Sequence, residues 1–145
     1  MKRKIGLLAT ARKKGSTPSA AIDLYISPLF VKSVQYAQEN YDDFYFYSAK
    51  EGLLTKDQYI EPYNISIKNL STLAKREWAI KVVSELEKHV RPSQCKIYIH
   101  GGWVYREYLQ PALERAGYQF DVPLEGFSIG KQLKWYDEQQ KIKNK

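Results

Sequence analysis

The chain has few of the residues on which metal and redox sites depend. Its 145 residues include one cysteine and two histidines. A single cysteine, Cys95, excludes an intrachain disulfide and a cysteine-rich metal site. The histidines, His89 and His100, lie on different predicted elements and show no zinc-ligand spacing. The sequence therefore predicts neither a metal site nor a cofactor.

Long apolar runs are also missing. No run reaches the length of a membrane-spanning helix. The basic start, Lys2–Lys4, leads into an apolar run that is too short for a signal peptide. We therefore expect a cytoplasmic protein that does not enter a membrane. The length favours one domain over residues 1–145, and a hydrophobic fraction of 43% argues against disorder.

The chain has fewer acidic residues than basic residues. Lysine and arginine together number 23 against 16 acidic residues, which gives a net charge of +7. A basic surplus favours an anionic partner such as nucleic acid or a free nucleotide. The 12 tyrosines and 3 tryptophans could stack on bases or fill a core. The alternative is a basic surface without any partner.

Four apolar runs predict strands, at residues 3–10, 42–47, 95–100 and 118–122. Helices are predicted between and after them, at residues 28–40, 71–89, 104–116 and 128–142. In the second helix, Leu73, Ile80, Val83 and Leu86 are expected to face inward. The alternation predicts a three-layer, Rossmann-like α/β domain, with a mainly parallel four-stranded sheet and helices on both faces. Residues 48–70 show no period, so they contain either a functional loop or an unrecognised element.

The unusual residues of the chain follow these strands. Polar or glycine-containing segments come after each run, at Ala11–Ser16, Ser48–Gly52, His100–Gly102 and Pro123–Gly126. Parallel strands bring such segments to one edge of a sheet, where open α/β sheets bind ligands. The sequence therefore predicts one site at the carboxyl edge.

The first of these segments is basic. Thr10, Arg12 and Lys13 could bind phosphate through backbone N–H groups and positive charge. The glycine spacing of a Walker loop is absent. The alternative interpretation is a solvated basic loop.

The second segment places a hydroxyl, an amine and a carboxylate within four residues. Ser48 with Lys50 could form a nucleophile and base pair, and Glu51 could position water. Alternatively, Ser48 is a capping residue and the two charges are solvated. Further on, Tyr63 is either a ligand-binding phenol or a structural residue beside Pro62.

The third segment, His100-Gly101-Gly102, gives the sharpest hypothesis. His100 is expected to reach the cavity with a partly accessible ring and to carry a proton, and Gly101 and Gly102 to allow close approach of a ligand. Trp103 and Arg106 could stack on a base or clamp a phosphate. The alternative makes His100 a hydrogen-bonded core residue.

The fourth segment leads into the last helix. Its candidate ligand-binding residues are Gly126, Ser128, Gly130 and Lys131. They combine open backbone, the positive end of a helix dipole and one added charge. The spacing is not that of a known phosphate loop, so this signal is weak.

Several of these motifs resemble a bacterial and phage family, catalogued as domain of unknown function 6884. The similarity lies in Tyr25 with Ser27–Phe30, in Ser48–Leu54, in Glu61–Tyr63 and, most specifically, in Pro123–Leu133. A weaker similarity links the Gly-Leu-Leu and Pro-Tyr portions to the peroxide-stress YaaA family, which is linked to DNA binding. Both resemblances imply a uracil-DNA-glycosylase type of α/β fold.

The chain departs from these patterns after its first strand. It has Thr10–Lys13 where the family often has a Cys-Ser-Lys-like run. It also lacks the acidic or amide residue with which glycosylases of the uracil type place water. The family itself implies no activity.

Two functions are consistent with the sequence. The first is hydrolysis of an N-glycosidic bond, with phosphate on the basic loop, the base on Tyr63 and Trp103, and His100 or Glu51 as proton carrier or water-positioning group. The second is a module that binds a nucleotide signal or DNA without turnover. Polar residues after every strand favour the first, and the missing acidic residue favours the second.

Overall fold

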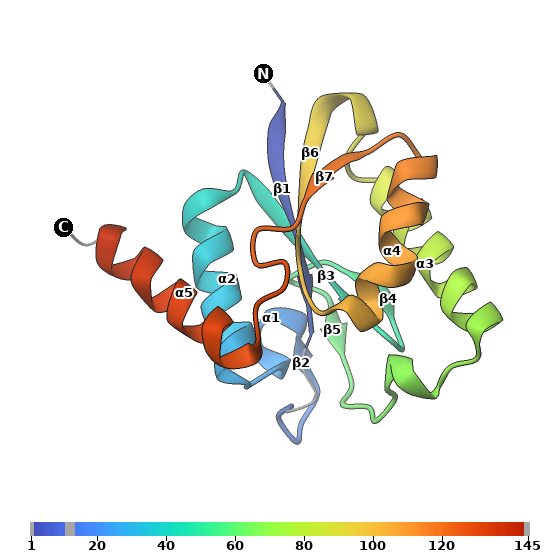
Figure 1. Cartoon of the computed structure of the whole chain (residues 1–145). Helices are drawn as coiled ribbons and strands as arrows, with labels where there is room; N and C mark the ends of the chain where they lie inside the picture. Colours follow the sequence, from blue (N-terminus) through green and yellow to red (C-terminus); the bar gives the residue numbers. More distant parts are fainter. Residues whose placement is uncertain (1, 11–13, 144–145) are drawn as a thin grey trace.

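The structure, a computed structural model, describes residues 2–10 and 14–143. A central sheet has the strand order β4-β3-β1-β6-β7 (Figure 1). Its strands are β1 (Arg3–Ala9), β3 (Asp43–Ser48), β4 (Gly52–Leu54), β6 (Cys95–His100) and β7 (Gln119–Asp121). Strands β1, β3, β6 and β7 are parallel and β4 is antiparallel. The predicted α/β class with a mainly parallel sheet is confirmed, but the sheet has five strands instead of four.

The extra strand lies within the segment that the sequence leaves without structure. Ser48 pairs with Gly52 across a tight hairpin, and Gly52 has a φ of 74°. That left-handed conformation is easy for glycine and strained for other residues. A three-residue strand is too short to show an alternating pattern, so periodicity missed it.

A second, smaller sheet lies outside the predicted strands and helices. Strand β2 (Ser19–Ala20) pairs antiparallel with β5 (Tyr59–Ile60). The four-residue helix α1 (Ala21–Leu24) follows β2 and packs Ala21 and Leu24 into the core. This ribbon carries residues 19–25 and 59–63 toward the carboxyl end of the main sheet (Figure 1).

The long helices begin where the sequence predicts them. They are α2 (Pro28–Asn40), α3 (Thr72–Glu87), α4 (Trp103–Arg115) and α5 (Ile129–Lys143), and two 3-10 turns cover Ile67–Asn69 and Pro92–Gln94. Ser27 caps α2 by accepting a hydrogen bond from the Phe30 backbone N–H at 3.3 Å. Ser71 caps α3 in the same way.

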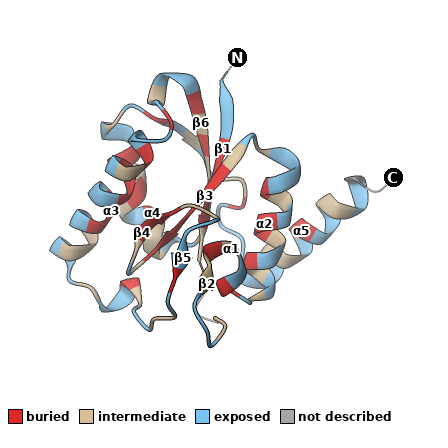
Figure 2. Ribbon diagram, turned by 180° about the vertical axis from the view of Figure 1, so that it is seen from behind, coloured by how far each residue is buried: buried red, intermediate tan, exposed pale blue. Residues whose placement is uncertain are grey.

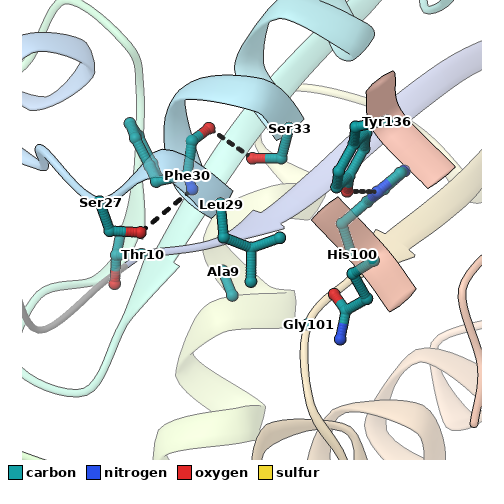
Figure 3. A pocket seen from close by; sticks show the side chains of 10 residues that line it. Ala9, Thr10, Ser27, Leu29, Phe30, Ser33, His100, Gly101 and Tyr136 are labelled. Atoms are coloured by element: carbon teal, nitrogen blue, oxygen red, sulfur yellow. Dashed lines mark hydrogen bonds between the residues drawn. The ribbon is translucent and has the colours of Figure 1, made fainter. Parts of the chain in front are cut away.

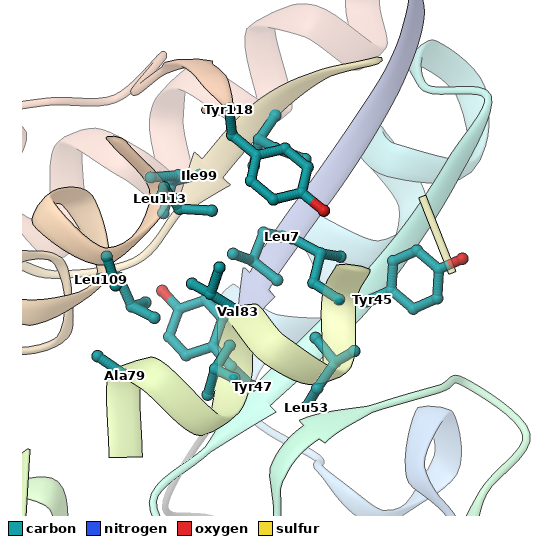
Figure 4. Close-up of a cluster of buried hydrophobic side chains, with 14 of the residues drawn as sticks. Leu7, Tyr45, Tyr47, Leu53, Ala79, Val83, Ile99, Leu109, Leu113 and Tyr118 are labelled. Carbon is teal, nitrogen blue, oxygen red and sulfur yellow. The ribbon is translucent and has the colours of Figure 1, made fainter. Parts of the chain in front are cut away.

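Hydrophobic side chains fill the space on two sides of the sheet. Leu7 and Tyr47 point toward α3 and α4, where they join Val83 and Leu109 (Figure 4). Their chain neighbours point the opposite way, because side chains alternate along a strand. They contact Phe30 of α2 and the short helix α1. Helix α5 lies outside α2 and packs against it (Figure 1).

The buried residues lie on the strands and on the inner faces of the helices (Figure 2). Helix α3 is rotated relative to the prediction: Leu73 and Ile80 are 66% and 55% exposed. Trp78 is buried instead, and its indole N–H donates to the Ser48 carbonyl at 2.8 Å. This bond between α3 and the end of β3 sets which face of the helix meets the sheet.

Candidate site at the carboxyl edge

Four hydroxyl groups meet beyond the carboxyl ends of β1 and β3. The Tyr25 and Tyr63 hydroxyls are 2.5 Å apart, and the side chains of Thr10 and Ser48 lie beside the Tyr25 phenol. Thr10 follows β1, Ser48 ends β3, and the tyrosines come from the chain beside the β2–β5 ribbon. We call these four residues the hydroxyl cluster. Register explains the meeting, since Ala9 pairs with Tyr47 and places the two strand ends side by side.

Burial fixes the protonation of this cluster. Tyr25 is 1% exposed. Removal from water raises its pKa well above the ordinary range, and the neighbouring Tyr63 raises it further. Tyr25 is therefore a neutral hydrogen-bonding group at physiological pH and cannot act as a base there.

Two lysines lie over the outer tyrosine. The Lys14 Nζ is 4.5 Å from the centre of the Tyr63 ring, and the Lys50 Nζ is 5.6 Å from it. A small cavity of about 40 Å³ opens beside them. It is lined by Thr10, Lys14, Ala49, Tyr63, Ile65, Ser66 and Tyr105. The cavity accepts a few water-sized groups, so a larger ligand would rest mostly on the surface around it.

Ser48 has the geometry of a capping residue, which was the alternative to a nucleophile and base pair of Ser48 with Lys50. Ser48 is fully buried, and its Oγ accepts a hydrogen bond from the Glu51 backbone N–H at 2.9 Å. It thereby holds the hairpin that leads into β4. The Glu51 carboxylate lies 3.7 Å from the Lys50 Nζ. The hairpin accounts for Ser48 as a capping residue, and it leaves Lys50 as the residue of this segment that reaches Tyr63.

His100 occupies the core, so the prediction of an accessible ring is wrong. The residue is 5% exposed. Its Nε2 lies 2.6 Å from the Tyr41 hydroxyl and its Nδ1 lies 2.6 Å from the Tyr136 hydroxyl. Burial lowers the pKa of His100 from 6.5 to about 3. A neutral ring with both nitrogens engaged is a structural link between β6, α5 and the end of α2.

A cavity of about 140 Å³ nonetheless touches this ring (Figure 3). Most of its surface is apolar, and it lies between the sheet edge and helices α2 and α5. Thr10 lines both this cavity and the one beside Tyr63. Gly101 and Gln132 of α5 also line it, so the first turn of α5 reaches the carboxyl edge.

The two glycines after His100 have different roles. A Cβ on Gly101 would lie 1.8 Å from the Tyr47 hydroxyl, so the space is filled by protein and not by a ligand. That hydroxyl donates to the His100 carbonyl at 3.0 Å. A Cβ on Gly102 meets no atom within 4 Å. Gly102 begins α4 without a side-chain cap, so it is the glycine that leaves backbone open at the edge.

Trp103 is an exposed aromatic residue at this edge, with 58% of its surface accessible. The Arg106 guanidinium lies 5.5 Å from the centre of its ring. Arg106 itself is buried, and donates from Nε to the Gly101 carbonyl and from Nη1 to Gln110. Arg106 therefore supports Trp103 from within, where the sequence suggested a phosphate clamp.

The segment before α5 lies apart from the hydroxyl cluster. Gly126 has a φ of 81° and forms a turn, and Ser128 caps α5 by accepting from the Lys131 backbone N–H. Gly130 has open space around it. Lys131 lines an outer groove with Phe127 and Trp135, which is a surface separate from the Tyr63 cavity. The four predicted residues of this segment therefore do not line that cavity.

Two predicted phosphate-binding residues cannot be placed, and one residue of the site was not predicted. Arg12 and Lys13 lie outside the described residues, and the next residue, Lys14, reaches the site. Tyr25 was missed as a site residue because its only signal was a place in a family motif. The β2–β5 pairing, which sequence periodicity did not reveal, brings its part of the chain next to Tyr63.

Fold and site together define an α/β protein with a polar and aromatic carboxyl edge. The model described as Family of unknown function (DUF6884) matches residues 5–138, so the chain belongs to that family. No curated protein and no solved structure gives a significant match. Across residues 2–10 and 14–143, no helix has the length and apolar character to span a membrane, and no three potential ligands from His, Cys, Asp and Glu gather as a metal site would need.

Proposed function

We propose that the carboxyl edge of the sheet binds a phosphate-bearing ligand of the nucleotide or nucleic-acid type. The observation that carries this proposal is the pair of lysines over Tyr63, a residue that lines a cavity together with other hydroxyl groups. Ammonium groups and hydroxyls are donors that suit phosphate oxygens. The net charge of +7 would attract such a ligand from solution.

An aromatic surface at the same edge supports a base next to the phosphate. Trp103 is exposed, and Arg106 beneath it is anchored by two hydrogen bonds. A ring held in this way can stack on a base with little loss of side-chain entropy. The resemblance to the YaaA family, linked to DNA binding, points to the same class of ligand.

Binding without turnover is the version that the geometry favours. In the part of the chain that the structure describes, the wall of the Tyr63 cavity contains no carboxylate and no imidazole. Tyr25 stays protonated and His100 is buried. The protein would then capture a nucleotide or a strand of DNA, as a phage or bacterial protein that sequesters a nucleotide signal would do.

Hydrolysis of an N-glycosidic bond is the second candidate, and Glu51 is the observation in its favour. Its carboxylate is partly exposed and lies 3.7 Å from the Lys50 Nζ. A carboxylate beside the bound base could position water for attack. If this candidate holds, a Glu51→Gln variant should bind as the parent protein does while releasing no free base.

The test is a binding titration with nucleotides and short single-stranded DNA, followed by an assay for released base. Lys50→Gln should weaken binding about tenfold, because it removes a charge-assisted contact to phosphate. Lys88→Gln is the matched control, since Lys88 lies at the far end of α3, near the start of β6. Equal affinity of the two variants for every ligand would contradict the proposed site.

A further inference from the structure

A larger cavity, of about 570 Å³, opens on the α2 side of the sheet. Cavities of this size accommodate small organic molecules. Lys4 of β1 lies on its border, six residues before Thr10, which corresponds to about 20 Å along a strand. The cavity is therefore separate from the hydroxyl cluster. It is lined by Lys4, Tyr36, Asn40, Tyr41, Tyr98, Asp121, Val122, Pro123 and Glu125.

Two stacked tyrosines form one wall of this cavity. The rings of Tyr41 and Tyr98 have centres 5.0 Å apart and an angle of 23° between their planes. Gly6 of β1 makes room for this stack, because a Cβ there would lie 2.7 Å from the Tyr41 ring. An aromatic surface is thus laid directly against the backbone of the central strand.

The buried His100 holds this surface in place. Its Nε2 bonds to the Tyr41 hydroxyl, and its Nδ1 bonds to Tyr136 of α5. Tyr41 therefore has its ring packed on a strand and its hydroxyl tied to the core. A surface fixed before binding loses less entropy when a ligand arrives.

The other walls suit a flat ring. Tyr36 of α2 stands at 80° to Tyr41, with ring centres 5.6 Å apart. Val122 and Pro123, in the connection from β7 to α5, add aliphatic surface. Aromatic rings stack in offset or edge-to-face geometry against such walls.

The rim carries charges of both signs. Glu125 and Asp121 supply carboxylate acceptors, and Asp121 is paired with Lys96 at 2.7 Å. Lys4 supplies a donor on the same rim. A cationic ligand would be repelled by Lys4 and an anionic one by Glu125. A neutral ring is repelled by neither charge. If its edge carries both donor and acceptor groups, it can hydrogen-bond to the carboxylates and to Lys4 on the rim.

We propose that this cavity binds a neutral, amino-substituted heteroaromatic ring of the nucleobase kind, stacked on the Tyr41–Tyr98 surface with its amino group on Glu125. His100 acts here as a positioning residue behind Tyr41. The proposal does not depend on the phosphate site, because the ring needs no phosphate to bind.

The test is an NMR titration of the ¹⁵N-labelled protein with free cytosine and free adenine. We expect saturable shifts at the backbone amides of Tyr98 and residues 121–125, and none at Thr10 or Ser48. Glu125→Gln should weaken binding about tenfold through loss of a hydrogen bond to a charged group. Glu138→Gln, an exposed carboxylate on α5, should bind as the parent does. Glu125 is exposed as well, so neither change should disturb folding.

Three results would overturn the proposal. The first is the absence of shifts at this cavity up to the solubility limit of the bases. The second is stronger binding of tetramethylammonium or benzoate than of either base, which would indicate a cation or anion site instead. The third is unchanged affinity in Glu125→Gln. Shifts confined to Thr10 and Ser48 would assign the bases to the phosphate site and refute this one alone.

Discussion

The hydroxyl of Tyr41 lies 2.6 Å from Nε2 of His100, a residue that is almost fully buried. The opposite nitrogen bonds to Tyr136. A neutral imidazole has one donor and one acceptor nitrogen, so it can serve both phenols at once. Three elements distant in sequence are joined by this one ring.

Replacement of His100 by alanine is expected to destabilise the protein. The change removes a hydrogen bond from each of two phenols and opens a cavity, which together cost roughly 2–5 kcal/mol. The midpoint of thermal unfolding should fall by about 10 °C or more. His89→Ala is the control, because His89 is exposed and its ring packs beside the Tyr45 ring. Equal melting temperatures for the two variants would show that the His100 bonds contribute little.

The stability of the protein should depend on pH through His100. Its folded pKa of about 3 lies below the ordinary 6.5, so between these values the unfolded chain binds a proton that the folded chain does not. Stability therefore falls as pH is lowered through this window, by up to about 1.4 kcal/mol per pH unit. Denaturant unfolding of the parent and of His100→Gln at pH 7, 6, 5 and 4 isolates the effect. The variant should show the shallower slope, and parallel slopes would refute the assignment.

Alanine at Gly101 should destabilise the protein, whereas alanine at Gly102 should not. At Gly101 the new Cβ would lie 1.8 Å from the Tyr47 hydroxyl, so the site is overpacked and should lose about 1–3 kcal/mol or more. At Gly102 the space is open and the melting temperature should hardly change. Adding Tyr47→Phe to Gly101→Ala removes the clashing oxygen and should recover part of the loss. Thermal melts of the four proteins show whether alanine at position 101 destabilises the protein by clashing with the Tyr47 hydroxyl or by straining the backbone.

The affinity for a polyanion should fall with salt if the lysines contact phosphate. Each contact contributes a slope of roughly 0.7–0.9 in log affinity against log salt concentration. Lys50→Gln should lower that slope by about one contact, and Lys88→Gln should leave it unchanged. Fluorescence anisotropy with a labelled single strand at several salt concentrations measures both quantities. A salt-independent affinity would mean that the lysines do not contact phosphate and that the excess of basic residues is only a feature of the protein surface.

The parallel core of the fold was within reach of sequence reasoning because its signals are local. Ser27 and Ser71 mark helix starts through their own hydroxyls, and the structure confirms both caps. The short strands β2, β4 and β5 gave no such signal. They have two or three residues each. Strands β2 and β5 also depend on pairing with each other across a long stretch of chain, whereas β4 pairs with the adjacent β3 through a hairpin.

The candidate site, too, could be predicted from the sequence only in part. The sequence could place Thr10, Ser48 and His100 at one edge, because parallel strands end together. It could not place their side chains. His100 turns inward because α5 brings Tyr136 to it, and Ser48 turns into a hairpin because β4 follows. The orientations of both side chains depend on tertiary contacts, which cannot be predicted from residue type and spacing alone.

Both edges of the main sheet end in strands of three residues, β4 and β7. So short a row of free backbone groups is a poor template for another chain to extend. We therefore expect that copies of this protein do not associate by pairing the edge strands of their main sheets. Strand β4 is too short to show a pattern in the sequence, and for the same reason its edge is a poor place for another strand to pair.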